Sequence, residues 1–307
     1  MMTSMTTIIE AESLAHLDDK ARQKLLLTDE ERIRTIRVGS WVGIEHVKEV
    51  LDRLEDMLQT PGVTRPPCML VVGPAFSGKT SIAEYFVAMH PPDLSPDNET
   101  TVAPVVMIDA PPKPDLSDFY SRILDRLMAP YKPTASSHEK YAQVKRLFRE
   151  LGVKMLVIDE IHHLIAGSLN RQREFRNAIK SLSNETKVSL VVLGIEEART
   201  AIYSDEQFSS RFIPYELPMW SNNKAFARLL RTMERRTPLR KPSNLGSPDM
   251  VNVIYAKSES NLGDIFDLVK EASVKAIRDG TECITRELLD SMKWVPPSKR
   301  KLFRRKL

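Results

Sequence analysis

The chain has 307 residues, 42% of them hydrophobic and 28% charged, and a formal net charge of +4 at pH 7. That length and composition predict a globular protein with a sizeable core, and its two cysteines exclude a disulfide framework. No apolar run approaches the roughly 18 residues of a membrane span and no secretion signal is visible, so we expect a protein of the reducing cytoplasm with no membrane partner.

The first predicted elements lead up to a buried strand. Residues 1–40 are polar, end in a basic stretch, and predict an N-terminal extension. A helix is expected over 43–58, where apolar residues recur at helical spacing. A proline-bounded loop at 61–67 then leads into an apolar run at 69–72, which predicts the first strand.

A complete phosphate-binding motif follows this strand. Residues Gly73–Thr80 have the pattern G-x-x-x-x-G-K-T, and a helix-compatible stretch at 81–89 comes next. Strand, loop and helix in this order are the context that the motif requires. Gly73 and Gly78 allow the backbone to curl so that its N–H groups face phosphate oxygens, and the positive end of the helix adds to that field.

The motif assigns roles to individual side chains and predicts ATP and Mg²⁺ as cofactors. Lys79 is expected to reach the β- and γ-phosphates, and Thr80 to ligate Mg²⁺. The predicted nucleotide contacts are Gly73, Pro74, Ala75, Phe76, Ser77, Gly78, Lys79, Thr80, Ser81 and Asp159.

Strands and helices then alternate along the chain. Strands are predicted at 105–109, 155–158 and 188–193, and helices at 115–128, 138–151 and 170–183. This alternation favours right-handed crossovers and a parallel sheet flanked by helices, which is an α/β fold.

An acidic pair, Asp159 and Glu160, ends the apolar run at 155–158. The carboxyl ends of parallel strands meet at the crevice where ligands bind. Together with the phosphate loop, the pair predicts that Asp159 belongs to the Mg²⁺ shell and that Glu160 polarises the attacking water.

Strand signals stop after Pro218. Helices are predicted at 223–236, 247–258, 263–278 and 285–293, which together indicate a small all-helical lid. The last residues are strongly basic and favour contacts with phosphates or acidic partners. The predicted domains are an extension at 1–40, a nucleotide-binding domain at 41–218, a helical lid at 219–295 and a basic tail at 296–307.

An α/β nucleotide domain followed by a helical lid resembles an AAA+ ATPase. Ser209-Ser210-Arg211-Phe212 lies near the start of the lid, where AAA+ proteins carry an arginine finger. The resemblance implies that Arg211 enters a neighbouring subunit's nucleotide site and is catalytic there, together with Lys79 and Glu160. The alternative is a salt bridge at the domain junction.

Within AAA+ proteins, residues 38–290 are similar to the TniB/TnsC family of bacterial transposition ATPases. The matching pieces are Val38-Gly39, Gly73–Thr80, Pro104-Val105-Val106, the run Met155–Leu164 with its sequence D-E-I-H-H-L, Val191–Gly194 and Asp205-Glu206-Gln207. The resemblance implies a homo-oligomer, ring or helical filament, that assembles on double-stranded DNA with ATP. It also implies that the assembly links a target-selector protein to a DDE-type transposase.

The family resemblance also places DNA contacts in the loop and helix after the second strand. They map to Lys113, Ser117, Lys132 and Thr134. Few aromatic residues interleave these groups, so contacts to the phosphate backbone are expected rather than base stacking or sequence readout.

Two positions depart from the family pattern. Ile195 follows the fourth strand where relatives often have Thr, and Phe266 stands where an arginine of the lid is expected. Both departures predict slow hydrolysis. The neighbouring His162 and His163 raise the question of a metal, but adjacent side chains on a helix point about 100° apart, so packing or an interface contact is expected instead.

Two other functions fit the same motifs. A replicative helicase loader of the DnaC/IstB kind shares the lid and the arginine finger, and only the D-E-I-H-H-L context favours transposition. A nucleotide-gated scaffold without useful turnover fits Ile195 and Phe266.

Overall fold

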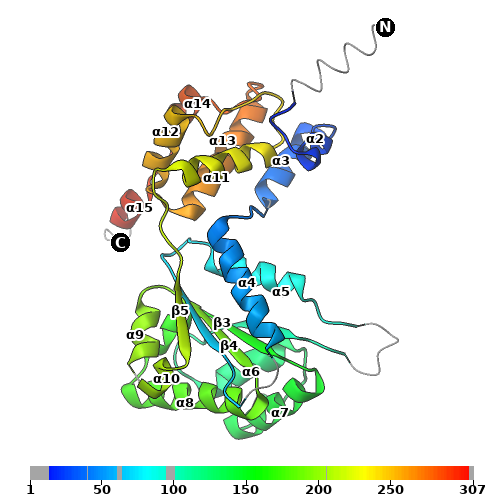
Figure 1. The fold of residues 1–307 in the computed structure, drawn as a ribbon, viewed down its shortest axis with the longest axis vertical. Coiled ribbons are helices and arrows are strands. Elements are labelled where there is room, and N and C mark those ends of the chain that lie inside the picture. Colours follow the sequence, from blue (N-terminus) through cyan, green and yellow to red (C-terminus); the bar gives the residue numbers. More distant parts are fainter. Residues whose placement is uncertain (1–13, 40, 61–63, 95–100, 205, 304–307) are drawn as a thin grey trace. The chain divides into compact units, whose positions relative to one another are not determined.

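The computed structural model describes residues 14–39, 41–60, 64–94, 101–204 and 206–303 (Figure 1). The chain divides into two compact units, one formed by residues 45–218 and the other by residues 1–44 together with 219–307. We call them the α/β unit and the helical unit. Across the described residues, no helix combines the length and apolarity that a membrane crossing needs.

The α/β unit is built on a five-stranded parallel sheet (Figure 1). Its strands are β1 Cys68–Val72, β2 Val105–Asp109, β3 Met155–Asp159, β4 Ser189–Gly194 and β5 Phe212–Glu216, in the spatial order β2-β3-β4-β1-β5. All four pairings are parallel. The expected α/β fold with a parallel sheet is therefore confirmed.

Helices connect and cover these strands. They are α4 Glu45–Gln59, α5 Lys79–Met89, α6 Leu116–Arg126, α7 Ser137–Glu150, the 3-10 helix η1 Ile161–Ala166, α8 Leu169–Thr186, α9 Glu197–Tyr203 and α10 Glu206–Ser209. Every residue of β1, β3 and β4 is buried, as expected for central strands covered on both faces. Leu70, Leu156 and Val192 pack with Phe119 and Phe175 in one core cluster, so the carboxyl ends of the central strands are fixed by a dense core.

The fifth strand is absent from the predicted pattern. β5 pairs only with β1 and therefore forms an edge of the sheet. Its sequence contains Pro214, and its Ile213 and Glu216 are exposed. An edge strand tolerates a proline that a central strand would exclude, and this hides it from pattern analysis.

The helical unit contains the four helices expected for a lid. They are α11 Lys224–Arg236, α12 Pro248–Ser258, α13 Leu262–Arg278 and α14 Arg286–Ser291. Phe226, Leu230, Ile254, Leu268 and Ala272 form the centre of its core. Asn223 and Asn261 cap α11 and α13 with side-chain oxygens, which explains where these two helices begin.

Residues from the chain's N-terminal part belong to the same unit. The sequence predicts an extension at 1–40, but α2 Asp19–Lys24 and α3 Asp29–Val38 are helices, and Ile33 and Ile36 enter the core of the helical unit. The side chain of Arg32 is fully buried and donates to both Glu282 carboxylate oxygens, at 2.5 and 2.9 Å. These partners are 250 positions apart, so no local pattern reveals the contact.

The predicted basic tail is also partly folded. Residues Pro297–Phe303 form α15, and the guanidinium of Arg300 lies 2.6 Å from Asp264 and over the ring of Trp294. Burial raises the pKa of Asp264, and the contact with Arg300 opposes that rise. Residues 304–307 lie outside the described residues.

Candidate nucleotide-binding site

The loop between β1 and α5 needs both of its glycines. Gly78 has φ +90°, a left-handed conformation that other residues rarely adopt. At Gly73, an added Cβ would lie 2.8 Å from the Ser77 hydroxyl and 3.1 Å from Leu217 Cβ. The close approach therefore requires a glycine at position 73, and the left-handed conformation favours one at position 78.

Lys79 is held inside this loop. Its side chain is only 7% exposed, and its Nζ donates to the carbonyl oxygens of Gly73 and Pro74 at 2.9 and 2.7 Å. Burial lowers the pKa of Lys79, while the nearby carboxylates of Asp159 and Glu160 act in the opposite direction. A cation with neutral acceptors at its tip is suited to receive a phosphate oxygen.

Thr80 and Asp159 meet directly. The Thr80 hydroxyl donates to Asp159 Oδ2 at 2.5 Å, and Asp159 Oδ1 accepts the Glu160 backbone N–H at 2.7 Å. Asp159 is 2% exposed at the carboxyl end of β3. A hydroxyl and a carboxylate at one point supply the hard oxygen donors that Mg²⁺ prefers, so the donor set fits this ion.

The remaining loop residues lie further out. Pro74, Ala75 and Phe76 are exposed, Ser77 is half-buried, and Ser81 is exposed in the first turn of α5. Phe76 has φ +62° although it carries a bulky side chain. This strain at the loop tip is of the kind that accumulates at ligand-binding sites.

Glu160 and the two histidines form a compact group. Glu160 has φ +55°, and its Oε2 lies 3.0 Å from His162 Nδ1. The ring centroids of His162 and His163 are 4.8 Å apart. The two rings therefore lie against each other on the short 3-10 turn that begins at Ile161.

Arg211 comes directly before β5 and contacts its own unit. Its NH1 donates to Asn184 Oδ1 in α8 at 2.6 Å, and the side chain is half-buried. Within the described residues of the α/β unit, its guanidinium forms no ion pair, and its Nε is buried without a hydrogen-bond partner. A neutral amide partner leaves the positive charge available.

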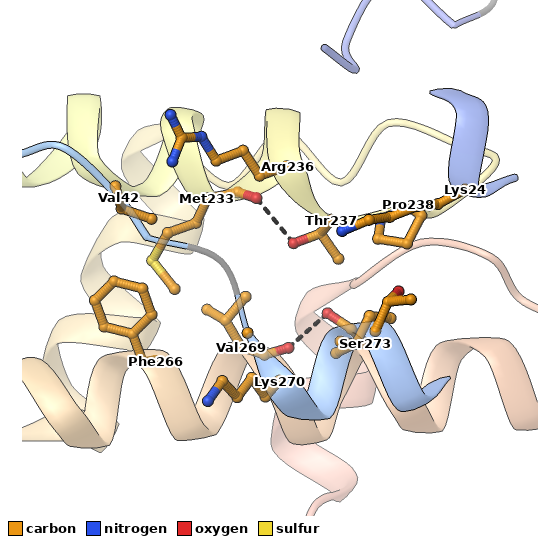
Figure 2. Close-up of a pocket in the computed structure, with 13 residues that line it drawn as sticks. Lys24, Val42, Met233, Arg236, Thr237, Pro238, Phe266, Val269, Lys270 and Ser273 are labelled. Carbon is orange, nitrogen blue, oxygen red and sulfur yellow. Dashed lines mark hydrogen bonds between the residues drawn. The ribbon is translucent and has the colours of Figure 1, made fainter. Parts of the chain in front are cut away.

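The two departures from the family pattern differ in their surroundings. Ile195 is half-buried directly after β4 in the α/β unit. Phe266 lines a cavity of about 40 Å³ within the helical unit, together with Val42, Met233 and Val269 (Figure 2). Neither side chain carries a group that can hydrogen-bond to phosphate.

Of the predicted DNA contacts, Lys113, Lys132 and Thr134 are exposed in the loops that flank α6. Ser117 is half-buried, and its hydroxyl accepts a hydrogen bond from Lys140 Nζ at 2.9 Å.

Lys140 is a residue that the sequence analysis missed. Although it is only 4% exposed, its ammonium contacts the Ser117 hydroxyl and lies 5.2 Å from the ring centroid of Tyr131. It thereby ties the start of α6 to the loop that carries Lys132. Helical periodicity could have revealed its burial, because Lys140 lies four residues before Val144 and eight before Phe148, on the buried face of α7.

A family comparison now identifies the chain. The family described as "Bacterial TniB protein" matches residues 32–222, which span the phosphate loop, the acidic pair and Arg211. The chain belongs to the TniB family. The resemblance inferred from the motifs is confirmed. No curated protein matches this TniB chain.

Solved structures share the fold. The chain is similar to Cdc6p from Pyrobaculum aerophilum, with TM-score 0.59 and 17% identity over 84% of this chain and 68% of that one. It is also similar to ORC1 from Aeropyrum pernix in complex with DNA, with TM-score 0.58 and 18% identity over 93% and 70%. ORC2 from the same organism, as ADPNP–ADP complexes, gives TM-score 0.56 and 14% identity over 80% and 64%. These neighbours confirm the predicted α/β fold class.

Proposed function

We propose that this TniB-family chain is an ATP-dependent regulator of DNA transposition. It binds ATP and Mg²⁺, oligomerises on duplex DNA, links a target-selector protein to a DDE-type transposase, and leaves the DNA when ATP is hydrolysed. The observation that carries the proposal is the contact of Thr80 with Asp159 beside the buried Lys79, in a chain whose residues 32–222 match TniB.

The residues of the loop bind and orient the triphosphate. The backbone N–H groups of 73–80 face the phosphates, and Lys79 exchanges its carbonyl partners for β- and γ-phosphate oxygens. Mg²⁺, held through Thr80 and Asp159, supplies charge neutralisation to the phosphates when it is bound. Glu160, one residue beyond Asp159, positions the attacking water and polarises it.

Arg211 completes the site of a neighbouring subunit. Its guanidinium has only the Asn184 amide as a hydrogen-bond acceptor in the described part of its own unit. A shift of this side chain toward the γ-phosphate of an adjacent subunit exchanges a hydrogen bond to a neutral amide for one to a charged phosphate oxygen. Hydrolysis therefore depends on assembly.

The loops around α6 track the DNA backbone. Lys113, Lys132 and Thr134 offer two exposed cations and a hydroxyl, and Lys140 holds Ser117 beside them. These groups suit phosphate oxygens rather than base edges. A similar fold occurs in ORC1, whose structure was solved in complex with DNA, and this supports DNA binding by the present chain.

Assembly on DNA tests the proposal. With ATP, the protein should sediment with a random-sequence duplex as a large oligomer, and with ADP it should not. Glu160→Gln should form the complex but fail to release it, because the Mg²⁺ ligands remain while the water-orienting carboxylate is lost. The stalled complex should stimulate strand transfer by a transposase encoded beside it. ATP-independent DNA binding, or a stalled complex that leaves strand transfer unchanged, would contradict the proposal.

A scaffold without turnover is the second candidate, and Ile195 favours it because this position offers no polar group to the γ-phosphate. Phosphate release measured with and without DNA separates the two functions. DNA-stimulated release supports the ATPase. Loading of a replicative helicase in place of transposase stimulation would favour the loader of the DnaC/IstB kind.

A further inference from the structure

We propose that Glu160, His162 and His163 form a binding site for a transition-metal ion such as Zn²⁺, and that occupancy of this site switches ATP hydrolysis off. The metal site stands on its own geometry. The switch rests on the proposed function, because it acts through the role of Glu160 in hydrolysis.

The three side chains converge within a few residues. One ligand atom of each lies within 4.8 Å of the ligand atoms of the other two, and His162 Nδ1 is 3.0 Å from Glu160 Oε2. The positive φ of Glu160 and the 3-10 turn that follows it place these groups on one side of the chain. All three side chains are half-buried, which leaves them within reach of an ion from solvent.

His163 has an unpaired ring nitrogen. Its Nδ1 is buried from solvent and has no hydrogen-bond partner among the described residues, whereas the buried Nδ1 of His162 has Glu160 Oε2 at 3.0 Å as its neighbour. A buried ring nitrogen without a partner loses the hydrogen bond that water would give it. A metal ion is one ligand that compensates such a loss.

The geometry lies within reach of a tetrahedral ion. With metal–ligand bonds of about 2.0–2.2 Å, the donor atoms of a tetrahedral zinc lie about 3.4 Å apart. Since no two of the donor atoms lie more than 4.8 Å apart, a pair must close by at most roughly 1.4 Å, and rotation about the two or more side-chain bonds of Glu and His supplies such a movement. Three protein ligands leave a fourth position for water.

The donor set separates this site from the Mg²⁺ site next to it. Two imidazoles and a carboxylate favour Zn²⁺ and related ions, whereas the hydroxyl of Thr80 and the carboxylate of Asp159 favour Mg²⁺. The two ions therefore occupy neighbouring positions without competing for the same ligands. Glu160 is shared only between the transition metal and the attacking water.

Occupancy has a direct chemical consequence. A carboxylate bound to Zn²⁺ through one oxygen is a weaker base and is fixed in orientation, so its second oxygen no longer polarises the attacking water effectively. The ion stabilises a state in which nucleotide binding is intact, because Lys79, Thr80 and Asp159 are untouched, while hydrolysis stops. In the proposed function, this state corresponds to a protein retained on DNA.

The first experiment measures binding without activity. Zn²⁺ is titrated into the full-length protein, free of nucleotide, in competition with a chromogenic chelator. The wild type should bind one equivalent, and His162→Ala, His163→Ala and His163→Gln should each weaken binding at least about tenfold, because loss of a ligand costs no less than loss of an outer-shell partner. His90→Ala is the matched control, since His90 pairs with Glu55 at 2.9 Å and, among the described residues, belongs to no cluster of three candidate metal ligands.

Several results would overturn the site. The first is equal zinc affinity of the wild type and the histidine variants. Circular dichroism and ATP binding show whether those variants are folded. Loss of zinc binding in His90→Ala is another, and binding that depends on Cys283 instead is a third, because that thiol is free and partly accessible.

The second experiment measures the switch. Zn²⁺ at about twenty times its dissociation constant leaves only about 5% of the site empty, so it should lower DNA-stimulated phosphate release by at least about tenfold in the wild type, with Mg²⁺ in large excess. For His163→Gln, inhibition should require at least about tenfold more zinc relative to its own zinc-free rate. Zinc that binds without inhibiting overturns the switch and leaves the site. If the wild type does not hydrolyse ATP at all, the proposed function and the switch are both contradicted. The zinc titration still shows whether the metal site exists.

Discussion

The two units of the molecule place their important charges in different ways. In the α/β unit, Lys79 bonds to carbonyl oxygens five and six positions earlier in the chain. In the helical unit, Arg32 bonds to Glu282, 250 positions away. Both cations are buried, but one belongs to a local motif and the other joins two ends of the chain.

This difference predicts that the local motif affects nucleotide binding and that the long-range ion pair affects stability. A loop built from neighbouring residues folds with its strand and helix, so a substitution in it should remove binding and leave the fold intact. A buried ion pair between distant segments contributes instead to holding those segments together. Substitution of Lys79 should therefore reduce nucleotide binding, whereas substitution of Arg32 should reduce the free energy of unfolding.

The largest effect is expected for Lys79→Ala. Nucleotide binding should fall below detection because the cation aimed at the β- and γ-phosphates is lost, while the thermal unfolding curve stays close to that of the wild type. Binding of a fluorescent ATP analogue measures this, with the exposed Lys154→Ala as control. Affinity within a few-fold of the wild type would show that the loop is not the nucleotide site.

Arg211→Ala should fold, bind ATP and hydrolyse it about 10³-fold more slowly, the usual contribution of an arginine finger. Mixing it with Lys79→Ala protein should restore part of the activity, because an intact Arg211 then meets an intact Lys79 across a subunit interface. Phosphate release from the mixture on DNA is the measurement. If both variants assemble together and the mixture stays inactive, Arg211 acts within its own subunit.

In the helical unit, Arg32→Met should lower the free energy of unfolding by up to about 3–5 kcal/mol, because the largely buried Glu282 loses its nearest cation and keeps only Arg240, whose Nε lies 3.7 Å away. The double variant with Glu282→Leu should recover much of this loss. Urea unfolding followed by circular dichroism measures both, and Arg34→Met, an exposed arginine of the same helix, is the control. ATP binding by the folded fraction should be unchanged.

Acid should weaken the same contact. Burial is the largest single influence and would raise the pKa of Glu282, but the hydrogen bonds from Arg32 and from the Arg240 backbone, together with the charges of both arginines, lower that pKa from 4.5. The stabilisation is therefore complete above the unfolded-state value of 4.5 and is lost as the pH falls through the lower folded-state value. The difference in unfolding free energy between wild type and Glu282→Gln should shrink over that range. A difference that stays constant there would show that the carboxylate is not coupled to folding.

The smallest effect concerns DNA. Removing Lys113 and Lys132 together should reduce the slope of log affinity against log salt by about 2, because each of these lysines is expected to neutralise one phosphate. Lys140→Met should lower affinity a few-fold with little change in slope, since Lys140 holds Ser117 rather than a phosphate. Filter binding at several salt concentrations tests this. An unchanged slope in the double variant would exclude these loops as the DNA-binding surface.

The sequence by itself determined the features that neighbouring residues encode. Three local patterns predict a strand, a phosphate loop and metal-binding acids in a fixed order: the apolar run before Gly73, the G-K-T triplet, and the acids after Ile158. They predict one site because a parallel sheet brings the carboxyl ends of its strands together. The fold class and the family followed from these residues and are confirmed.

Only the tertiary structure decided which distant residues meet. The proline of β5 lies in an edge strand of the sheet. Arg32 forms hydrogen bonds with Glu282, 250 positions away, and the buried Lys140 donates a hydrogen bond to Ser117. The convergence of His162 and His163 with Glu160 likewise depends on side-chain rotation that helical periodicity does not describe. The physical reason is the same in each case: periodicity reports which face a residue occupies, whereas a buried polar group is placed by the partner that compensates its lost hydration.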